Sequence, residues 1–194
     1  MFLPYIPQKK NISLFLVIDF EFARGVHRTD AVALLVSSGA NVNKQNSGGD
    51  TPLHWAVANK YEDVVKVLLT SKEKNNLQVN QQNKLGWTAL HFACRYGSKD
   101  VVELLLQQNG TDVKAETKQG CTPLHLASAH GHKEVVELLL QQNGIDANKV
   151  NEEGNTPLHL AVRKCMLCEV NEASMELQPC AHTVLCEDCS KTST

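Results

Sequence analysis

The chain has 194 residues, of which 42% are apolar, so it is long enough for one packed domain and a small second module. Its formal charge at pH 7 is −2, which gives no overall electrostatic attraction to nucleic acid or to an anionic membrane. No apolar run reaches the ~18 residues that a membrane-crossing helix needs. We therefore expect protein partners, with no nucleic acid and no membrane among them.

Residues 1–21 lack the features of a secretory signal. Their apolar run, residues 14–18, is short, and Asp19 and Glu21 follow it without a small-residue cleavage site. We expect this stretch to form an irregular leader that packs against the first structural unit.

A four-residue motif then recurs along the chain. It reads Thr-Pro-Leu-His, or once Thr-Ala-Leu-His, and successive copies are 37, 34 and 34 residues apart. The copies begin at Thr51, Thr88, Thr122 and Thr156. A second pattern, an acidic residue followed by Val-Val and a Leu-rich stretch, recurs at residues 63–69, 100–106 and 134–140. Self-similarity at this period is typical of a stacked solenoid, whose units bury their apolar faces against one another.

Each unit is predicted to contain two antiparallel helices. The motif Thr suits an N-cap and the Pro suits the first helical position, while the Val- and Leu-rich stretch is the apolar stripe of the second helix. Asn-Gly pairs at 109–110 and 143–144 are typical of a helix end. Turns before the next unit are predicted at Gly49, Gly86, Gly120 and Gly154.

These motifs closely resemble the ankyrin repeat over residues 22–164, about four repeats and a half. The resemblance implies an all-α solenoid of helix-turn-helix repeats with short β-hairpin loops. A degenerate first unit, which we call the worn first unit, has a second helix at Asp30–Val36. Its first helix, near Phe20–His27, lacks the motif. Unit two has about three extra residues near Lys72–Leu77, which predict a longer loop. Ankyrin repeats imply binding to other proteins, not chemistry.

The motif histidines recur once per unit, so we interpret them as structural hydrogen-bonding groups within and between repeats. Cys94 and Cys121 are scattered singly, and we expect them to be buried or half-buried fillers. Trp55 and Phe92 follow motif histidines, where packing between units is expected.

The resemblance implies that a partner binds the concave helix positions and the loop tips. On this sequence the candidate partner-binding residues are Asn59, Tyr61, Trp87, Arg95, Tyr96 and His130, with Ala58 and Ala129 beside them. Loop tips are expected around Asp50, Trp87 and Cys121. Trp87 has two interpretations: an exposed aromatic anchor for a partner, or a side chain that folds back over a neighbouring hairpin.

Five of the seven cysteines and one histidine fall within residues 165–189. The six residues are Cys165, Cys168, Cys180, His182, Cys186 and Cys189. Two Cys-x-x-Cys pairs supply four thiolates, which satisfy tetrahedral Zn²⁺. A redox Cys-x-x-Cys role and a disulfide framework are the alternatives, and the clustering of thiols and the repeat body favour zinc.

The spacing of these six residues resembles the first six ligands of a C3HC4-type RING finger, and Pro179–His182 is similar to the C-terminal RINGs of inhibitor-of-apoptosis and mind bomb-type ubiquitin ligases. The resemblance implies that residues 165–194 form a partial RING. One zinc ion would be held by Cys165, Cys168, Cys186 and Cys189, and half of a second site by Cys180 and His182. Leu167 would contact the ubiquitin-conjugating enzyme.

Ligands seven and eight, and the second helix of the fifth repeat, are missing from the sequence. We expect the chain to be a fragment, a splice variant or an imperfect gene model, and this leaves its ligase activity uncertain. Two functions stay open: an ankyrin–RING E3 ubiquitin ligase, and a non-catalytic ankyrin scaffold or adaptor with a single zinc knuckle. Reduced, clustered thiols favour the cytoplasm, with the nucleus as the other option.

Overall fold

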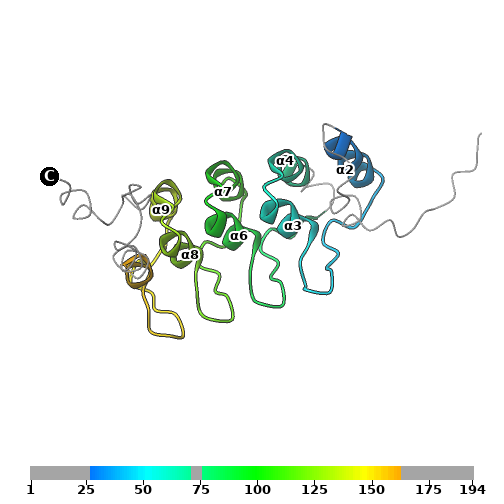
Figure 1. Ribbon diagram of the computed structural model, residues 1–194. Helices are drawn as coiled ribbons and strands as arrows, with labels where there is room; N and C mark the ends of the chain where they lie inside the picture. The colour runs from blue at the N-terminus through cyan, green and yellow to red at the C-terminus, as the bar shows by residue number, and fades with distance from the viewer. Residues whose placement is uncertain (1–26, 71–75, 163–194) are drawn as a thin grey trace, which may run out of the picture.

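The computed structural model describes residues 27–70 and 76–162. The regular elements in these ranges are helices, which pair into successive helix–turn–helix units stacked in one direction (Figure 1). The first helices of the units are α3 (Pro52–Ala58), α6 (Ala89–Tyr96), α8 (Pro123–Ala129) and a helix of residues 157–162. The second helices are α2 (His27–Ser37), α4 (Glu62–Thr70), α7 (Lys99–Leu106) and α9 (Lys133–Leu140). The all-α solenoid predicted from the repeats is confirmed.

The recurring motif starts each first helix by a capping box. In α6 the Thr88 hydroxyl accepts a hydrogen bond from the His91 backbone amide, and His91 Nδ1 accepts one from the Thr88 amide at 3.1 Å. Thr51 and Thr122 cap α3 and α8 in the same way, with Pro in the first turn. These contacts satisfy amides that a helix start otherwise leaves unpaired.

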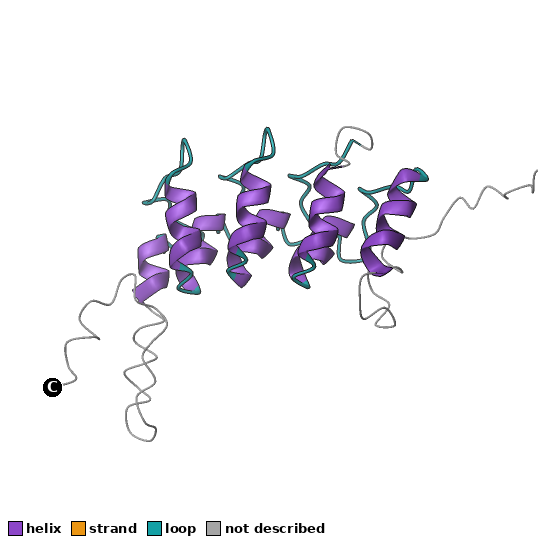
Figure 2. Cartoon of the chain, turned by 90° about the horizontal axis from the view of Figure 1, so that it is seen from above, coloured by secondary structure: helices purple, strands orange, loops and turns teal. Residues whose placement is uncertain are grey.

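Stacking of the units buries one continuous apolar core. Helix α6 packs between α3 and α8, and in the second row α4 packs between α2 and α7. Figure 2 shows this regular succession of helices from above. Leu68, Leu105 and Leu139 occupy equivalent positions on the second helices and are fully buried. Each such leucine contributes about 1.5–3 kcal/mol through its removal from water.

Long loops connect the units and project from the same side of the stack (Figure 1). Neighbouring loops are tied by backbone hydrogen bonds, from Lys84 N to Gly48 O and from Lys118 N to Leu85 O, both 3.0 Å. The predicted β-hairpins therefore take the form of hydrogen-bonded loops, and the described residues contain no strand. Gly86, one of the predicted turn glycines, has a φ of +79°.

The worn first unit keeps its predicted second helix as α2, which begins at His27. Residues 20–26 of its expected first helix lie outside the described residues, as do the leader at 1–21 and most of the extra loop of unit two. Within the described ranges no helix combines the length and apolarity needed to cross a membrane.

Candidate partner-binding surface and zinc ligands

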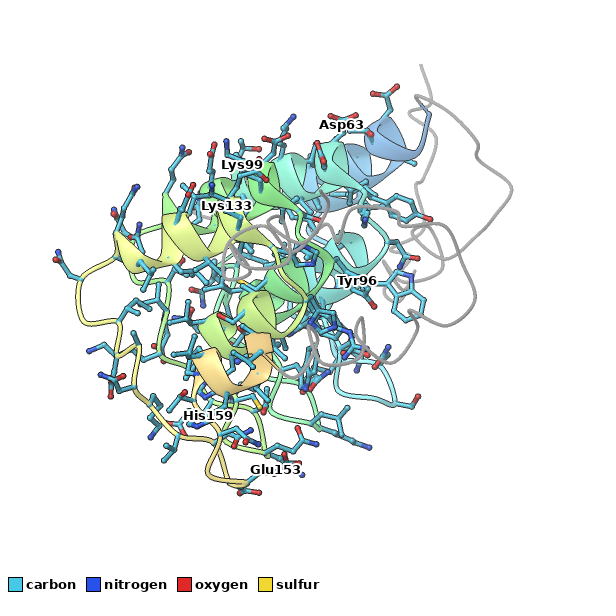
Figure 3. All side chains as sticks on the ribbon, turned by 60° about the vertical axis from the view of Figure 1, so that its left-hand side comes forward. Asp63, Tyr96, Lys99, Lys133, Glu153 and His159 are labelled. Atoms are coloured by element: carbon cyan, nitrogen blue, oxygen red, sulfur yellow. The ribbon has the colours of Figure 1, made fainter. Side chains whose placement is uncertain are left out.

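The C-terminal ends of the first helices bring predicted partner-binding residues into one row. Asn59 caps α3, Tyr96 ends α6 and His130 caps α8, so the repeat period places these three in register, and Arg95 directly precedes Tyr96. We call these four residues the helix-end row. Figure 3 shows Tyr96 apart from Lys99 and Lys133 on the second helices and from Glu153 on a hairpin loop.

An arginine–aromatic cluster lies at the centre of this row. The Arg95 guanidinium carbon is 5.4 Å from the centre of the Trp87 ring, a cation–π arrangement. The Trp87 and Phe92 rings are 5.0 Å apart, and Phe92 meets His54 of the preceding unit edge-on at 5.9 Å. This packing holds the charge of the exposed Arg95 in a defined place, and the exposed Tyr96 is the next residue of the helix. Phe92 therefore packs between units, as expected.

Trp87 does not lie at a loop tip, contrary to the sequence prediction. It directly precedes the N-cap Thr88 and is half-buried against the core, so packing has drawn much of the ring inward. The equivalent residues Asp50 and Cys121 are also half-buried at the bases of their loops. The Asp50 carboxylate accepts a hydrogen bond from Asn83 Nδ2 at 2.8 Å, so it is engaged within the protein.

The exposed loop residues lie two to three positions earlier, at Lys84 and Leu85 in the loop that ends at Trp87. The repeat motif alone did not indicate these two exposed positions. The turn glycine that follows, Gly86, marks this place, because the chain reverses there with a positive φ.

His132 contacts the helix-end row although the sequence did not indicate it. Its Nε2 donates to the Arg95 carbonyl oxygen at 3.0 Å, which fixes the end of α6 from the next unit. The His130 and His132 rings stack 6.0 Å apart and nearly parallel. No repeat signal marks His132, because the equivalent residues are Ser98 and Tyr61.

The remaining predicted residues differ in exposure. Asn59 is exposed and its side-chain amide donates to the Trp55 carbonyl at 2.8 Å. Tyr61 is half-buried and packs against the core just before α4. Asn59 thus offers a polar surface group, whereas much of Tyr61 serves packing.

The motif histidines form structural hydrogen bonds, as predicted. His54, His91 and His125 each accept at Nδ1 from their N-cap amide and donate from Nε2 to a carbonyl of the next unit. Burial lowers the pKa of all three, that of His91 to about 4, so the rings are neutral at pH 7. Among the described residues no group of His, Cys, Asp or Glu side chains is arranged to hold a metal.

The six predicted zinc ligands and Leu167 lie outside the described residues. Their chemistry still fits zinc, because the sequence supplies five sulfur donors and one imidazole within 25 residues, and both are ligands that Zn²⁺ prefers. Cys94 and Cys121 belong to the repeats, the first buried and the second half-buried, as expected of fillers.

The stacked, capped helix pairs form a repeat scaffold with a row of side chains along the ends of its first helices. The sequence model described as ankyrin repeats (3 copies) matches residues 22–117, 74–151 and 109–172, and the chain therefore belongs to the ankyrin-repeat family. A second model, described as zinc finger, C3HC4 type (RING finger), matches residues 161–194, so the chain joins ankyrin repeats to a RING-type sequence. No curated protein matches the chain.

Proposed function

We propose that this protein acts in ubiquitin transfer as a RING-type E3 ligase in which the ankyrin repeats hold the protein to be modified. The observation that carries the proposal is the presence, in one chain, of a protein-binding solenoid and a C3HC4-type RING sequence directly after it. The proposal places the protein in the cytoplasm, where thiols remain reduced and available to zinc.

The helix-end row is the proposed substrate-docking surface. Arg95, held over the Trp87 ring, provides a positive charge for a carboxylate, and the exposed Tyr96 at the next position of α6 provides an apolar contact. The partner segment would thus carry an acidic side chain next to an apolar one. Asn59 and His130 extend the surface toward the neighbouring units.

In the RING segment, Cys165, Cys168, Cys186 and Cys189 would hold one zinc ion, and Cys180 and His182 would contribute to a second. Zinc supplies folding energy to such modules and fixes their shape. Leu167 would contact the conjugating enzyme. A lysine amine of the bound protein then attacks the ubiquitin thioester on that enzyme, the new amide bond forms, and the enzyme's thiol leaves. The ligase contributes proximity and orientation.

Reconstituted ubiquitin transfer tests this proposal. Zinc-loaded protein, incubated with activating enzyme, ubiquitin and a panel of conjugating enzymes, should build ubiquitin chains, and Leu167→Ala should abolish them while zinc content stays the same. Zinc per chain distinguishes the ligase from an adaptor: about two ions support a RING, and one ion without transfer supports a scaffold with a zinc knuckle. Absence of transfer with every conjugating enzyme would overturn the ligase proposal.

A charge reversal tests the docking surface separately. Proteins that bind the wild type should no longer bind Arg95→Glu. They should still bind Lys44→Glu, which is the control because Lys44 is exposed in the first unit. Lys44→Glu should unfold at the wild-type urea concentration, whereas Arg95→Glu loses the cation–π contact with Trp87 and should be less stable by about 0.5–1 kcal/mol, too little to unfold the protein. An unchanged set of bound proteins with Arg95→Glu and with Tyr96→Ala would remove this surface from the proposal.

A further inference from the structure

The apolar face on which repeats stack is open at the last described helix. Leu158 is 56% exposed, whereas the equivalent Leu53, Leu90 and Leu124 are only 1–2% exposed. The same sequence position is thus buried wherever another unit follows and is uncovered at residues 157–162. Figure 3 views the stack from this end, with His159 on its outermost described helix.

Two further side chains belong to this open face. Val162 lies one turn after Leu158 and is exposed, although the equivalent Val57 and Cys94 are completely buried. On the second helices Leu140 is about half exposed, whereas its equivalents Leu69 and Leu106 are buried and half-buried. We call Leu140, Leu158 and Val162 the end face. Exposed apolar side chains at positions that are otherwise buried are costly in water and favour a contact site.

The following segment of the chain is tied to this face by a very short connection. Cys165, the first predicted zinc ligand, comes three residues after Val162. Since an extended chain spans at most ~3.6 Å per residue, the two Cα atoms are within about 11 Å of each other. The ankyrin and RING matches even overlap, at residues 161–172, so no linker separates the two modules.

Segment 163–194 also has the composition to cover an apolar face. Besides its predicted zinc ligands it contains apolar residues at Met166, Val170, Met175, Leu177, Val184 and Leu185. A tether this short raises the effective concentration of the segment at the end face far above that of a free partner.

We propose that segment 163–194, folded around zinc, packs on the end face and caps the repeat stack. The inference rests on zinc binding by the predicted RING ligands, but it does not require ubiquitin transfer. Its consequence is that the two modules behave as one folding unit: zinc binding stabilises the last repeats, and the RING segment is held in a fixed position at the end of the substrate-docking surface.

Hydrogen–deuterium exchange on the full chain tests the coupling to zinc. With zinc bound, amides of α9 and of residues 157–162 should exchange roughly tenfold more slowly than after zinc removal by a chelator. Amides of α3, two units before α9 and three before residues 157–162, should exchange at the same rate in both conditions. Equal exchange at α9 and residues 157–162 with and without zinc would overturn the inference.

A matched pair of variants tests the contact itself. Leu158→Gln on the end face and Leu85→Gln on a hairpin loop remove the same side chain at the same 56% exposure. If segment 163–194 covers Leu158 in solution, Leu158→Gln should lower the melting temperature of the zinc-loaded chain by about 4 °C, and Leu85→Gln by less than about 1 °C. Equal shifts in the two variants would show that nothing covers the end face.

Sedimentation analysis tests the other candidate that could cover the end face, which is a second copy of the chain. The cap predicts that wild type and Leu158→Gln are monomers at equal concentrations. If the wild type is a dimer and Leu158→Gln is a monomer, the end face is a contact of an end-to-end dimer and the cap proposal is wrong. A zinc-loaded monomer that gives the predicted exchange pattern but no ubiquitin transfer would leave the cap standing and refute only the ligase proposal.

Discussion

His91 joins its own repeat to the next by donating a hydrogen bond from Nε2 to the backbone carbonyl of Cys121, 30 residues further along the chain, at 3.1 Å. The other ring nitrogen accepts from the Thr88 amide, so both nitrogens of this buried ring are paired. An acceptor at Nδ1 and a donor at Nε2 define a neutral imidazole in one tautomer. The repeat motif thus serves two purposes at once, to cap a helix and to connect units.

The contribution of this ring depends on the unit that follows it. His91→Ala should lower the free energy of unfolding by about 2–4 kcal/mol, because it leaves a cavity, removes the acceptor of the buried Thr88 amide and breaks the bond to the next repeat. His159→Ala is the matched control: His159 makes the same contacts with Thr156 but is exposed, and its loss should cost about 1 kcal/mol or less. Urea unfolding followed by circular dichroism measures both. Equal losses would mean that capping, not the connection between repeats, is the main role of the ring.

Stability should also depend on pH through these rings. Burial lowers the pKa of His54, His91 and His125 in the folded protein, and that of His91 falls to about 4 from an ordinary value near 6.5. Between these values the unfolded chain binds protons that the folded chain does not, so the free energy of unfolding falls as pH drops below 6.5. The contribution of these neutral rings to stability should be fully present above pH 6.5. The loss that His91 causes should level off below about pH 4.

Chemical unfolding at pH 7.5, 6, 5 and 4 checks this dependence. His91 alone accounts for a loss of about 3 kcal/mol across the range, since one pKa unit corresponds to about 1.4 kcal/mol. In His91→Gln the loss should be smaller by that amount. A wild-type free energy of unfolding that is unchanged from pH 7.5 to pH 4 would contradict the neutral, buried state of the three rings.

The regular part of the fold was predictable from the sequence because local and global signals agree. Thr at the N-cap, His three residues later and Gly at the turn each satisfy a local rule, and their period repeats the same unit. The helices, the turn glycines and the structural role of the histidines were therefore predicted correctly.

Side-chain placement at the loops was harder to predict, because it depends on contacts between units. Trp87 was expected near a tip, either as an exposed anchor or folded back over a neighbouring hairpin, but it lies at the base of its loop against Phe92 and Arg95 of its own repeat. His132 has no signature in the repeat and gains its role only from the nearby Arg95 carbonyl. Neither contact can be read from spacing along the chain.

Two glycines allow the cost of backbone conformation to be separated from the cost of close approach. Gly86 and Gly110 both have positive φ, +79° and +84°. A Cβ at Gly86 would lie 2.8 Å from the Lys118 backbone nitrogen in the next loop, whereas a Cβ at Gly110 would meet nothing within 4 Å. Gly110→Ala should therefore cost about 1 kcal/mol from conformation alone, and Gly86→Ala about 3 kcal/mol.

Urea unfolding of the two alanine variants provides the comparison. Gly86→Ala should also weaken the hydrogen bond from Lys118 N to Leu85 O, because the loops must separate to admit a methyl group. Faster hydrogen exchange at the Lys118 amide would report this. Equal destabilisation in both variants would show that the loops do not approach as closely as described.

The two repeat cysteines should differ sharply in reactivity. Cys94 is fully buried, and burial raises the pKa of its thiol because the interior disfavours the thiolate. Cys121 is half-buried, and its sulfur accepts a hydrogen bond from Asn151 Nδ2 at 3.5 Å. Since the thiolate is the nucleophile, iodoacetamide at pH 8 should label Cys94 roughly tenfold or more slowly than Cys121 in the native protein. Peptide mass spectrometry resolves the two sites.

Labelling in urea is the control, because both thiols are then exposed and their rates should be equal. Equal rates without urea would contradict the packing of α6 between α3 and α8.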